Sequence, residues 1–249
     1  MKKLPLRRII VDRGLAPDES SAERSIIAGL VEIPGIPYEK VKPGTLFNPD
    51  VELRIKERRR FVSRGGLKLQ GALDKFHIKP AGAVCADIGA STGGFSDCLL
   101  QNGAAKIYAI DVAYGKFDYT LRDEPHIVLF ERTNFKYFDF SMFKEKIDIF
   151  VIDVSFISVK TIFRKLKEYF KNGNSSEIVC LIKPQFEADK KYLRKGIVLE
   201  GEAPRILSET IRDIEQLGYE VVNEMTSPIK GHKGNIEYLA LVKPQRHKT

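Results

Sequence analysis

The sequence predicts an α/β fold with a largely parallel sheet covered by helices on both sides, preceded by a small separate module. Two observations predict it. From residue 84 onward, apolar segments of strand length alternate with amphipathic segments of helix length, as in strand–helix–strand units. Before residue 60 the pattern is instead two short helices followed by short strands and turns, and a charged run at 56–60 separates the two regions. We therefore expect two domains, 1–58 and 64–249, joined by a charged linker at 56–63.

The first region is expected to be a small α+β module. Apolar residues between Leu4 and Leu15 fit one face of a short helix, which Gly14 ends. Ser20 is a candidate N-cap for a second helix, with Glu23 at the capping-box position, and Gly29 is a plausible stop. Short strands are expected within 31–37 and 51–55.

The second region is expected to contain seven strands. Five apolar segments, each followed by helical or turn sequence, are found at 84–88, 106–110, 127–130, 147–152 and 177–182. The clearest helices are expected at 95–100, 159–170 and 205–217. Two last strands, at 219–225 and 236–242, are separated by a loop without a helix, which predicts one antiparallel pairing at the sheet edge.

Composition narrows the class of protein. The 249 residues carry a net charge of +8, and the first 60 residues hold 13 Lys and Arg against nine Asp and Glu, so half of the excess lies in a quarter of the chain. This density fits either a solvated basic face or a surface for an acidic polymer. No apolar run is long enough for a membrane helix. Cys85, Cys98 and Cys180 have no paired spacing, which argues against a disulfide framework or cysteine zinc site and favours buried thiols in a reducing cytoplasm.

A glycine-rich loop follows the first strand of the second region. It holds Gly89, Gly93 and Gly94 just before a helix, and Asp111 ends the next strand 22 residues after Gly89. Ligands bind at the carboxyl ends of such strands, and an acidic residue at that distance binds ribose hydroxyls. The middle glycine of a dinucleotide motif is replaced by Ser91. S-adenosylmethionine, which has no phosphate, is therefore favoured, and Asp87 would suit its amino group.

Two other interpretations of this loop remain open. Residues 89–93 also form a G-x-S-x-G pattern, as in hydrolases. A hydrolase would need a histidine downstream, and only His126, His232 and His247 are available. Alternatively, the glycines serve only a tight turn.

Four polar residues stand beside otherwise apolar segments. Asp153 and Lys183 follow two strands, Glu237 lies at the start of the last one, and Lys68 lies on the helix that enters the domain. Taken alone, each of these residues is more often explained without a function, as a solvated residue at a strand end or as a lysine that extends its charge to solvent. Together they could form a Lys–Asp–Lys–Glu cluster above the sheet, next to the glycine loop.

These features make the chain similar to the TlyA (hemolysin A) family of ribosomal RNA 2′-O-methyltransferases. Six segments carry the resemblance in order: FVSRGGLKL at 61–69, DIGASTGGF at 87–95, ERTN at 131–134, DVSFIS at 153–158, KPQFE at 183–187 and GNIEY at 234–238. The resemblance implies a Rossmann-like, seven-stranded methyltransferase domain of the FtsJ-like (RrmJ) type after an N-terminal S4 RNA-binding domain. It also implies S-adenosylmethionine as cofactor and ribosomal RNA or ribosomal subunits as partner, with cytidine ribose as the target.

The resemblance assigns roles to individual residues. Lys68, Asp153, Lys183 and Glu237 correspond to the catalytic tetrad. The implied cofactor residues are Asp87, Gly89, Ala90, Ser91, Thr92, Gly93, Gly94, Phe95, Asp111, Thr133 and Asn134. The expected RNA-binding residues are Arg7, Arg8, Arg13, Ser20, Arg24, Lys40, Lys42, Arg58, Arg59, Arg60, Lys230 and Lys233.

The reaction would be an in-line displacement in which the weak nucleophile, a ribose hydroxyl, needs help. Lys183 would remove the hydroxyl proton or orient the hydroxyl, with Asp153 positioning Lys183 and Glu237 holding Lys68. Two alternatives are a non-catalytic RNA-binding assembly factor and, least favoured, a pore-forming cytolysin. The sequence carries no signal for oligomeric state.

Overall fold

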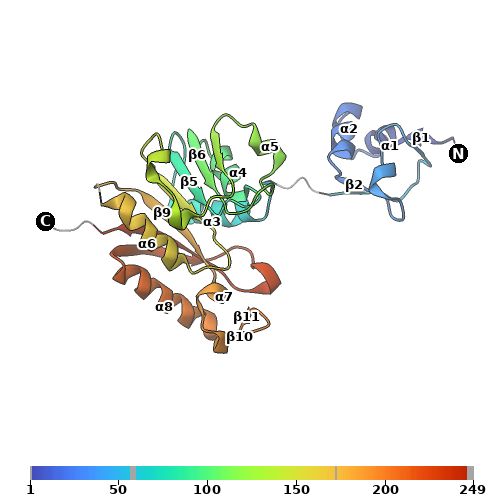
Figure 1. Ribbon diagram of the computed structural model, residues 1–249. Helices are drawn as coiled ribbons and strands as arrows, with labels where there is room; N and C mark the ends of the chain where they lie inside the picture. Colours follow the sequence, from blue (N-terminus) through green and yellow to red (C-terminus); the bar gives the residue numbers. More distant parts are fainter. Residues whose placement is uncertain (1, 57–59, 172, 246–249) are drawn as a thin grey trace. The chain divides into compact units, whose positions relative to one another are not determined.

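The computed structural model describes residues 2–56, 60–171 and 173–245, and the chain forms two compact units that divide after residue 59 (Figure 1). The second unit begins before the expected linker ends. Phe61 is buried, and the amide of Val62 donates to Asp97 Oδ2 at 2.7 Å. Residues 60–63 are therefore packed as part of the second unit.

The first unit is a small α+β module. Its helices are α1 (Leu6–Asp12) and α2 (Glu19–Ile27). Two short antiparallel pairs join β1 (Leu4–Pro5) to β3 (Leu46–Phe47) and β2 (Val31–Glu32) to β4 (Arg54–Ile55). A 3₁₀ turn lies at Tyr38–Lys40. The core consists of buried aliphatic side chains from both helices and the segments that follow: Leu6, Ile10, Ala22, Ile26, Val31, Ile33 and Val41.

The helices α1 and α2 end at the glycines expected from the sequence, but α2 begins at a different residue. Gly14 and Gly29 take positive φ angles of 70° immediately after α1 and α2, as glycine stop signals do. The N-cap of α2 is Asp18, whose carboxylate accepts from the amide of Ser21 at 2.6 Å. The prediction of Ser20 as N-cap was wrong. An earlier acidic cap binds the free amides and places Ser20 inside the first turn.

The second unit is built on a seven-stranded sheet in the order β12-β13-β9-β8-β5-β6-β7. The strands are β5 (Val84–Ile88), β6 (Lys106–Ile110), β7 (Ile127–Phe130), β8 (Ile149–Ile152), β9 (Glu177–Ile182), β12 (Tyr219–Thr226) and β13 (Tyr238–Pro244). Strands β5 to β9 pair in parallel. β13 is antiparallel to both β9 and β12. The predicted antiparallel edge pairing is confirmed, and β13 starts at Tyr238, two residues after the predicted position.

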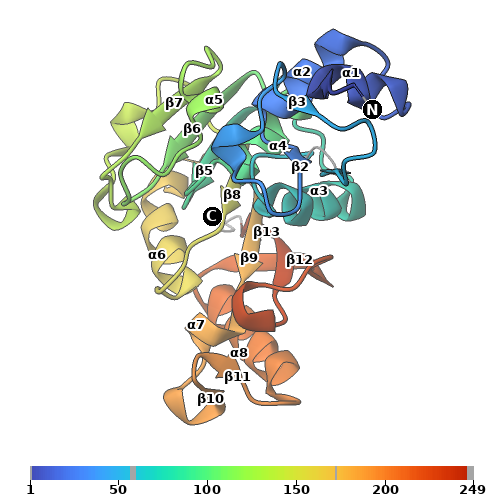
Figure 2. The ribbon, with the colours of Figure 1, turned by 90° about the vertical axis from the view of Figure 1, so that its right-hand side faces the viewer.

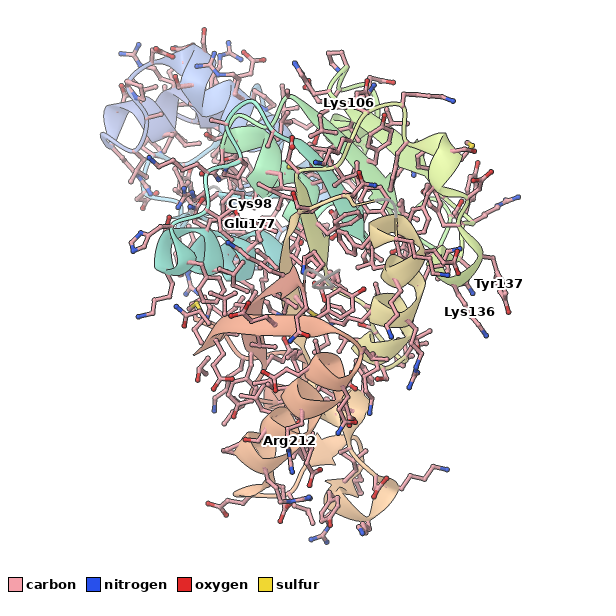
Figure 3. The ribbon with its side chains drawn as sticks, turned by 90° about the vertical axis from the view of Figure 1, so that its left-hand side faces the viewer. Cys98, Lys106, Lys136, Tyr137, Glu177 and Arg212 are labelled. Carbon is pink, nitrogen blue, oxygen red and sulfur yellow. The ribbon has the colours of Figure 1, made fainter. Side chains whose placement is uncertain are left out.

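Helices cover both faces of this sheet. One face packs against α6 (Val159–Phe170) and α8 (Glu202–Gln216) through buried side chains such as Phe163 and Leu207. The other packs against α3 (Gly65–Phe76) and α4 (Gly94–Gln101) through Leu69 and Leu99. Cys98 on α4 and Arg212 on α8 mark the two layers in Figure 3. Each layer buries alternate residues of the same strands, which confirms the predicted doubly covered α/β sheet.

Three short elements complete the second unit: α5 (Tyr119–Arg122), α7 (Pro184–Glu187), and a hairpin of β10 (Leu193–Arg194) and β11 (Ile197–Val198). Short 3₁₀ turns lie at Phe135–Tyr137, Phe140–Met142, Lys190–Tyr192 and His232–Gly234. The hairpin lies beside α7 and α8 in Figure 2. It was not expected from the sequence, because two-residue strands carry no readable periodicity.

Candidate active site

The glycine loop lies at the carboxyl ends of β5 and β6, where the sequence places it. Gly89 has a φ of 87° and Gly93 a φ of 88°, in the left-handed region that favours glycine. The amides of Gly89 and Ala90 donate to the carbonyl oxygen of Ile110 at 2.9 and 3.2 Å. A Cβ at Gly89 would lie 2.5 Å from the carbonyl oxygen of Asp153. The loop is therefore folded tightly between β6 and the end of β8.

Asp111 fixes the loop from the neighbouring strand. Its Oδ2 accepts from the amide of Ser91 at 2.8 Å, and its Oδ1 accepts from the amide of Ala113 at 2.6 Å. A carboxylate has about four acceptor positions. Two are used here, and the others can accept ligand hydroxyl groups.

Asp87 lies at the base of the loop and is fully buried. Its Oδ2 accepts from the hydroxyl of Ser96 at 2.6 Å, while its Oδ1 has no hydrogen-bond partner in the described part of the chain. Burial raises the pKa of this carboxyl to about 7, with a further rise from the charge of Asp153, while the Ser96 hydrogen bond opposes the shift. A cation near the loop would stabilise the ionised form.

Thr133 and Asn134 lie just after β7. The amide of Thr133 donates to the carbonyl of Asp111 at 2.9 Å, which places Thr133 beside the glycine loop. The side chain of Asn134 accepts from the amide of Lys136 at 3.0 Å and is exposed. Beyond it, Lys136 stacks on the exposed ring of Tyr137, and both point away from the unit (Figure 3). Of the two, Thr133 is the better placed to line a cofactor site.

The four tetrad residues form two lysine–carboxylate pairs. Lys68 Nζ on α3 lies 2.5 Å from Oε2 of Glu237, which is only 2% exposed. Lys183 Nζ at the end of β9 lies 2.5 Å from Oδ1 of Asp153 at the end of β8. The parallel pairing of β8 and β9 brings the second pair together, whereas the first joins residues 169 positions apart in sequence.

A cavity of about 250 Å³ connects the pairs to the loop. Its walls include Lys68, Asp153, the backbone of Gly89 and Ser91, and Gly231. One lysine and one carboxylate, taken from different pairs, therefore face the same space as the glycine loop. The arrangement can hold a nucleoside on the loop and orient a polar group against it.

A family model described as FtsJ-like methyltransferase matches residues 61–243. The chain belongs to this family. "Hemolysin A" of Brachyspira hyodysenteriae is 40% identical over 94% of this chain and 98% of its own length. The "16S/23S rRNA (cytidine-2'-O)-methyltransferase TlyA" of Mycobacterium tuberculosis is 39% identical over 95% of this chain and 88% of its own length.

A solved structure supports the same relationship. The "Putative hemolysin from Streptococcus thermophilus" is 36% identical, covers 98% of this chain and 90% of its own, and has a TM-score of 0.71. The similarity to the TlyA (hemolysin A) family and the Rossmann-like methyltransferase fold are thereby confirmed, and the protein is a methyltransferase. Membership of a methyltransferase family argues against the hydrolase interpretation of the glycine loop. His126 in addition lies just before β7, at the amino edge of the sheet, away from Ser91.

Three residues near the tetrad have contacts that sequence reasoning missed. Lys183 Nζ donates to the hydroxyl of Ser155 at 2.8 Å. The Nε2 of Gln185 donates to Oε1 of Glu237 at 3.1 Å. Arg64 donates to the carbonyl of Lys230 at 2.8 Å and so anchors the loop before Glu237 to α3. Ser155 and Gln185 both lie two residues from a tetrad member, which is the signal that could have drawn attention to them.

Some of the expected RNA-binding residues of the first unit already have partners within the protein, and others do not. Arg7 pairs with Glu19 at 2.9 Å, and Arg8 pairs with Asp12 at the same distance. Arg13 donates to the carbonyl of Pro49, and Arg24 to the hydroxyl of Ser21. Ser20, Lys40 and Lys42 are exposed. Within residues 2–56, Lys40 and Lys42 have no carboxylate within 4.0 Å, so their charges are available to a ligand.

The remaining expected RNA-binding residues fall in or near the second unit. Arg58 and Arg59 lie outside the described residues. Arg60 donates to Oε1 of Gln70 at 3.0 Å and stacks on Phe61, which gives it a structural role. Lys230 and Lys233 are exposed on the loop beside the cavity.

All three cysteines are buried, as predicted, and burial raises the pKa of Cys85 and of Cys98 to about 12. In the described ranges no helix has both the length and the apolar character needed to cross a bilayer. The same residues contain no group of three His, Cys, Asp or Glu side chains arranged to hold a metal ion.

Proposed function

We propose that this methyltransferase uses S-adenosylmethionine to methylate a ribose 2′-hydroxyl, with cytidine as the nucleoside, in ribosomal RNA. The observation that carries the proposal is the tetrad itself, because each lysine–carboxylate pair contributes one residue, Lys68 or Asp153, to the wall of the cavity that the glycine loop lines. An enzyme that methylates a base would need side chains that hydrogen-bond to the edge of that base next to the reacting atom. Two lysines held by carboxylates are better suited to orienting a ribose hydroxyl oxygen. The name of the Mycobacterium tuberculosis relative describes the same reaction.

The residues present fit S-adenosylmethionine. The backbone of Gly89 to Phe95 would hold the amino-acid part, and the remaining acceptor positions of Asp111 would bind the ribose hydroxyls. The Oδ1 of Asp87 has no hydrogen-bond partner in the described part of the chain, and the positive charge of the amino group would compensate it. When bound, the cofactor supplies an electrophilic methyl group on a sulfonium.

The side chains at the cavity would act on the hydroxyl. Asp153 and Ser155 hold Lys183 from one side. In this position Lys183 would orient the 2′-hydroxyl by donating a hydrogen bond to its oxygen. A lone pair of that oxygen would remain free to accept the methyl group that the cofactor supplies, and the hydroxyl proton would pass to water. Lys68, held by Glu237, places a second positive charge beside the oxygen. Most of the acceleration then comes from positioning.

We assign the first unit, 1–58, to RNA attachment as an S4 domain, and the second to catalysis. The S4 assignment rests on the resemblance and on the exposed cations of the first unit, among them Lys40 and Lys42. Because ribosomal subunits are the proposed substrate, the enzyme would work in the cytoplasm.

The test is transfer of a tritiated methyl group to undermethylated ribosomal subunits, followed by mapping of the modified nucleotide. We expect a 2′-O-methylcytidine product with the wild type. Lys183→Ala should fold, bind the cofactor and lose at least about 100-fold in rate. A wild-type-like rate in Lys183→Ala would remove the assigned role. Tight binding of subunits with no transfer by the wild type would instead support the non-catalytic assembly factor.

A further inference from the structure

The β10–β11 hairpin and the turn before it carry a dense set of positive charges. Lys190, Lys191, Arg194 and Lys195, here called the hairpin cations, are all exposed. No acidic residue occurs between Lys190 and Leu199. The hairpin thus presents four positive charges within six residues on a protruding element (Figure 2).

The hairpin is fixed against the loop that leads to the tetrad. Its turn places Lys195 and Gly196 at φ angles of 52° and 79°, as in a tight two-residue hairpin turn. The ammonium of Lys233 donates to the carbonyl of Lys195 at 3.2 Å. The buried Asn235 donates to the carbonyl of Gly196 at 3.0 Å and accepts from the amide of Val198 at 3.0 Å. Every one of these contacts uses backbone atoms of the hairpin, so its side chains remain available.

The same loop forms part of the cavity wall. Lys230 and Gly231 line the cavity, and Glu237 follows two residues after Asn235. A chain of direct contacts therefore leads from the hairpin turn, through Lys233 and Asn235, to the cavity where the hydroxyl would react.

These charges are not neutralised by nearby acids. Within the described ranges, Lys190, Arg194, Lys195, Lys230 and Lys233 have no carboxylate within 4.0 Å, and Lys191 approaches Asp189 only at 3.9 Å, with both side chains largely exposed. On the neighbouring helix α8 the arrangement is different, because Arg205 pairs with Glu202 at 2.7 Å and with Glu209 at 2.5 Å. A cluster of cations that is mostly without acidic partners concentrates a positive field, which attracts a polyanion.

We propose that the hairpin cations, together with Lys230 and Lys233, bind backbone phosphates of the RNA strand that carries the target ribose and guide that strand into the cavity. This inference rests on the proposed RNA substrate and adds a surface within the catalytic unit itself. Flexible Lys and Arg side chains on a fixed backbone are suited to sequence-independent phosphate contacts. Base recognition would have to come from other residues.

The test is a full-length variant that removes the four hairpin charges: Lys190→Gln, Lys191→Gln, Arg194→Gln and Lys195→Asn. Asn is chosen at 195 because it tolerates the positive φ. The matched control removes four exposed charges at the opposite, amino edge of the sheet: Lys144→Gln, Lys146→Gln, Lys167→Gln and Lys171→Gln. Both variants change the net charge by the same amount, so a general charge effect would appear in both.

Binding of undermethylated ribosomal subunits is measured over a range of salt concentrations, alongside affinity for S-adenosylmethionine. The hairpin variant should bind subunits at least about tenfold more weakly at moderate salt. Its plot of log affinity against log salt should be shallower by about one for each phosphate that the variant no longer binds, up to about four. The KM for subunits should rise more than kcat falls, and cofactor affinity should stay at the wild-type value. The control variant should retain wild-type subunit affinity and slope.

Three results would overturn the inference. One is a hairpin variant with unchanged subunit affinity and salt slope. Another is an equal loss in the control variant, which would show a net-charge effect alone. The third is binding to vesicles of phosphatidylserine and phosphatidylcholine that depends on the hairpin cations while RNA binding does not, which would assign the surface to a membrane. A wild type that binds no RNA would refute the proposed function itself, whichever way the variants behave.

Discussion

Gly231 offers a direct test of how Glu237 is positioned. Its φ lies outside the left-handed region, so alanine can adopt the same backbone without strain. An added Cβ, however, would lie 1.9 Å from Oε1 of Glu237 and 2.3 Å from its Cδ. Contacts below about 3 Å are not tolerated, and the carboxylate must therefore move by at least about 1 Å. Because Lys68 lies 2.5 Å from the other carboxylate oxygen, that movement would disturb the pair.

The expected cost of Gly231→Ala follows from that displacement. A misplacement of about 1 Å in an active site lowers the rate by about 100-fold, which corresponds to about 2.7 kcal/mol in the activation free energy. Overpacking at a buried carboxylate should also lower the free energy of unfolding by about 1–3 kcal/mol. Single-turnover methyl transfer measures the first quantity, and chemical denaturation measures the second. Gly44→Ala is the control, because its Cβ would meet only Arg7, at 3.8 Å, and should change neither.

A double-mutant comparison makes this reasoning refutable. In a Glu237→Ala background the clashing carboxylate is gone, so adding Gly231→Ala should have almost no further effect on rate or stability. If Gly231→Ala lowers the rate as much in that background as in the wild type, alanine acts through the loop and not through Glu237. Wild-type turnover in the single variant would show that the carboxylate can move without loss.

Three further predictions concern the cofactor site and the first unit. Asp111→Ala removes the acceptor of the Ser91 amide and should weaken S-adenosylmethionine binding at least about tenfold by calorimetry; an unchanged affinity would contradict the role of Asp111. The raised pKa of Asp87, about 7 against 3.8, means that only the unfolded chain ionises there between about pH 4 and 7, so stability falls as pH rises through this range. In Asp87→Asn, the free energy of unfolding measured by denaturation should lack this part of its decrease with pH, up to about 4 kcal/mol. A variant with the same pH dependence as the wild type would count against the raised pKa of Asp87. Deleting residues 1–56 should preserve cofactor affinity, because the second unit has its own cores, but weaken subunit binding and its salt dependence; unchanged subunit binding would argue against the RNA-attachment role.

Much of the fold could be predicted because most of its parallel strands, β5, β6, β8 and β9, are short and largely buried apolar runs. The predicted bounds at 84–88, 106–110, 127–130 and 177–182 match β5, β6, β7 and β9, since a parallel strand covered on both faces is apolar throughout. The strand predicted from 147 begins as β8 at Ile149. The first two residues of the predicted strand bond to other segments. The amide of Ile147 donates to the hydroxyl of Tyr169, and Asp148 Oδ2 accepts from the amide of Val84. These are tertiary contacts that periodicity does not record.

The site was predictable where chemistry follows a strand end and unpredictable where it depends on packing across the chain. Asp153 and Lys183 end adjacent parallel strands, which places them together. From the sequence, Gly231 is only one residue of a glycine-rich loop. The sequence does not show that Glu237 fills the space that a Cβ on Gly231 would occupy. The hairpin cations were missed for a related reason. Their importance depends on the backbone contacts that attach the hairpin to the loop at Lys233 and Asn235.

The glycine loop and Asp153, to which we assign cofactor binding and the positioning of Lys183, share one piece of backbone. The space beside Gly89 is filled by the carbonyl oxygen of Asp153, and the amide of Asp153 donates to the carbonyl of Ile88 at 2.9 Å. The residue that pairs with Lys183 is therefore held by the strand end from which the glycine loop starts. A shift of the loop by a few tenths of an ångström has to move Asp153 as well, because no side-chain atom lies between them to absorb it. Because β8 lies between β5 and β9 in the sheet, Asp153 at the end of β8 links the glycine loop after β5 to Lys183 after β9. Ligand contacts that fix the position of the loop would by the same route fix the position of Lys183.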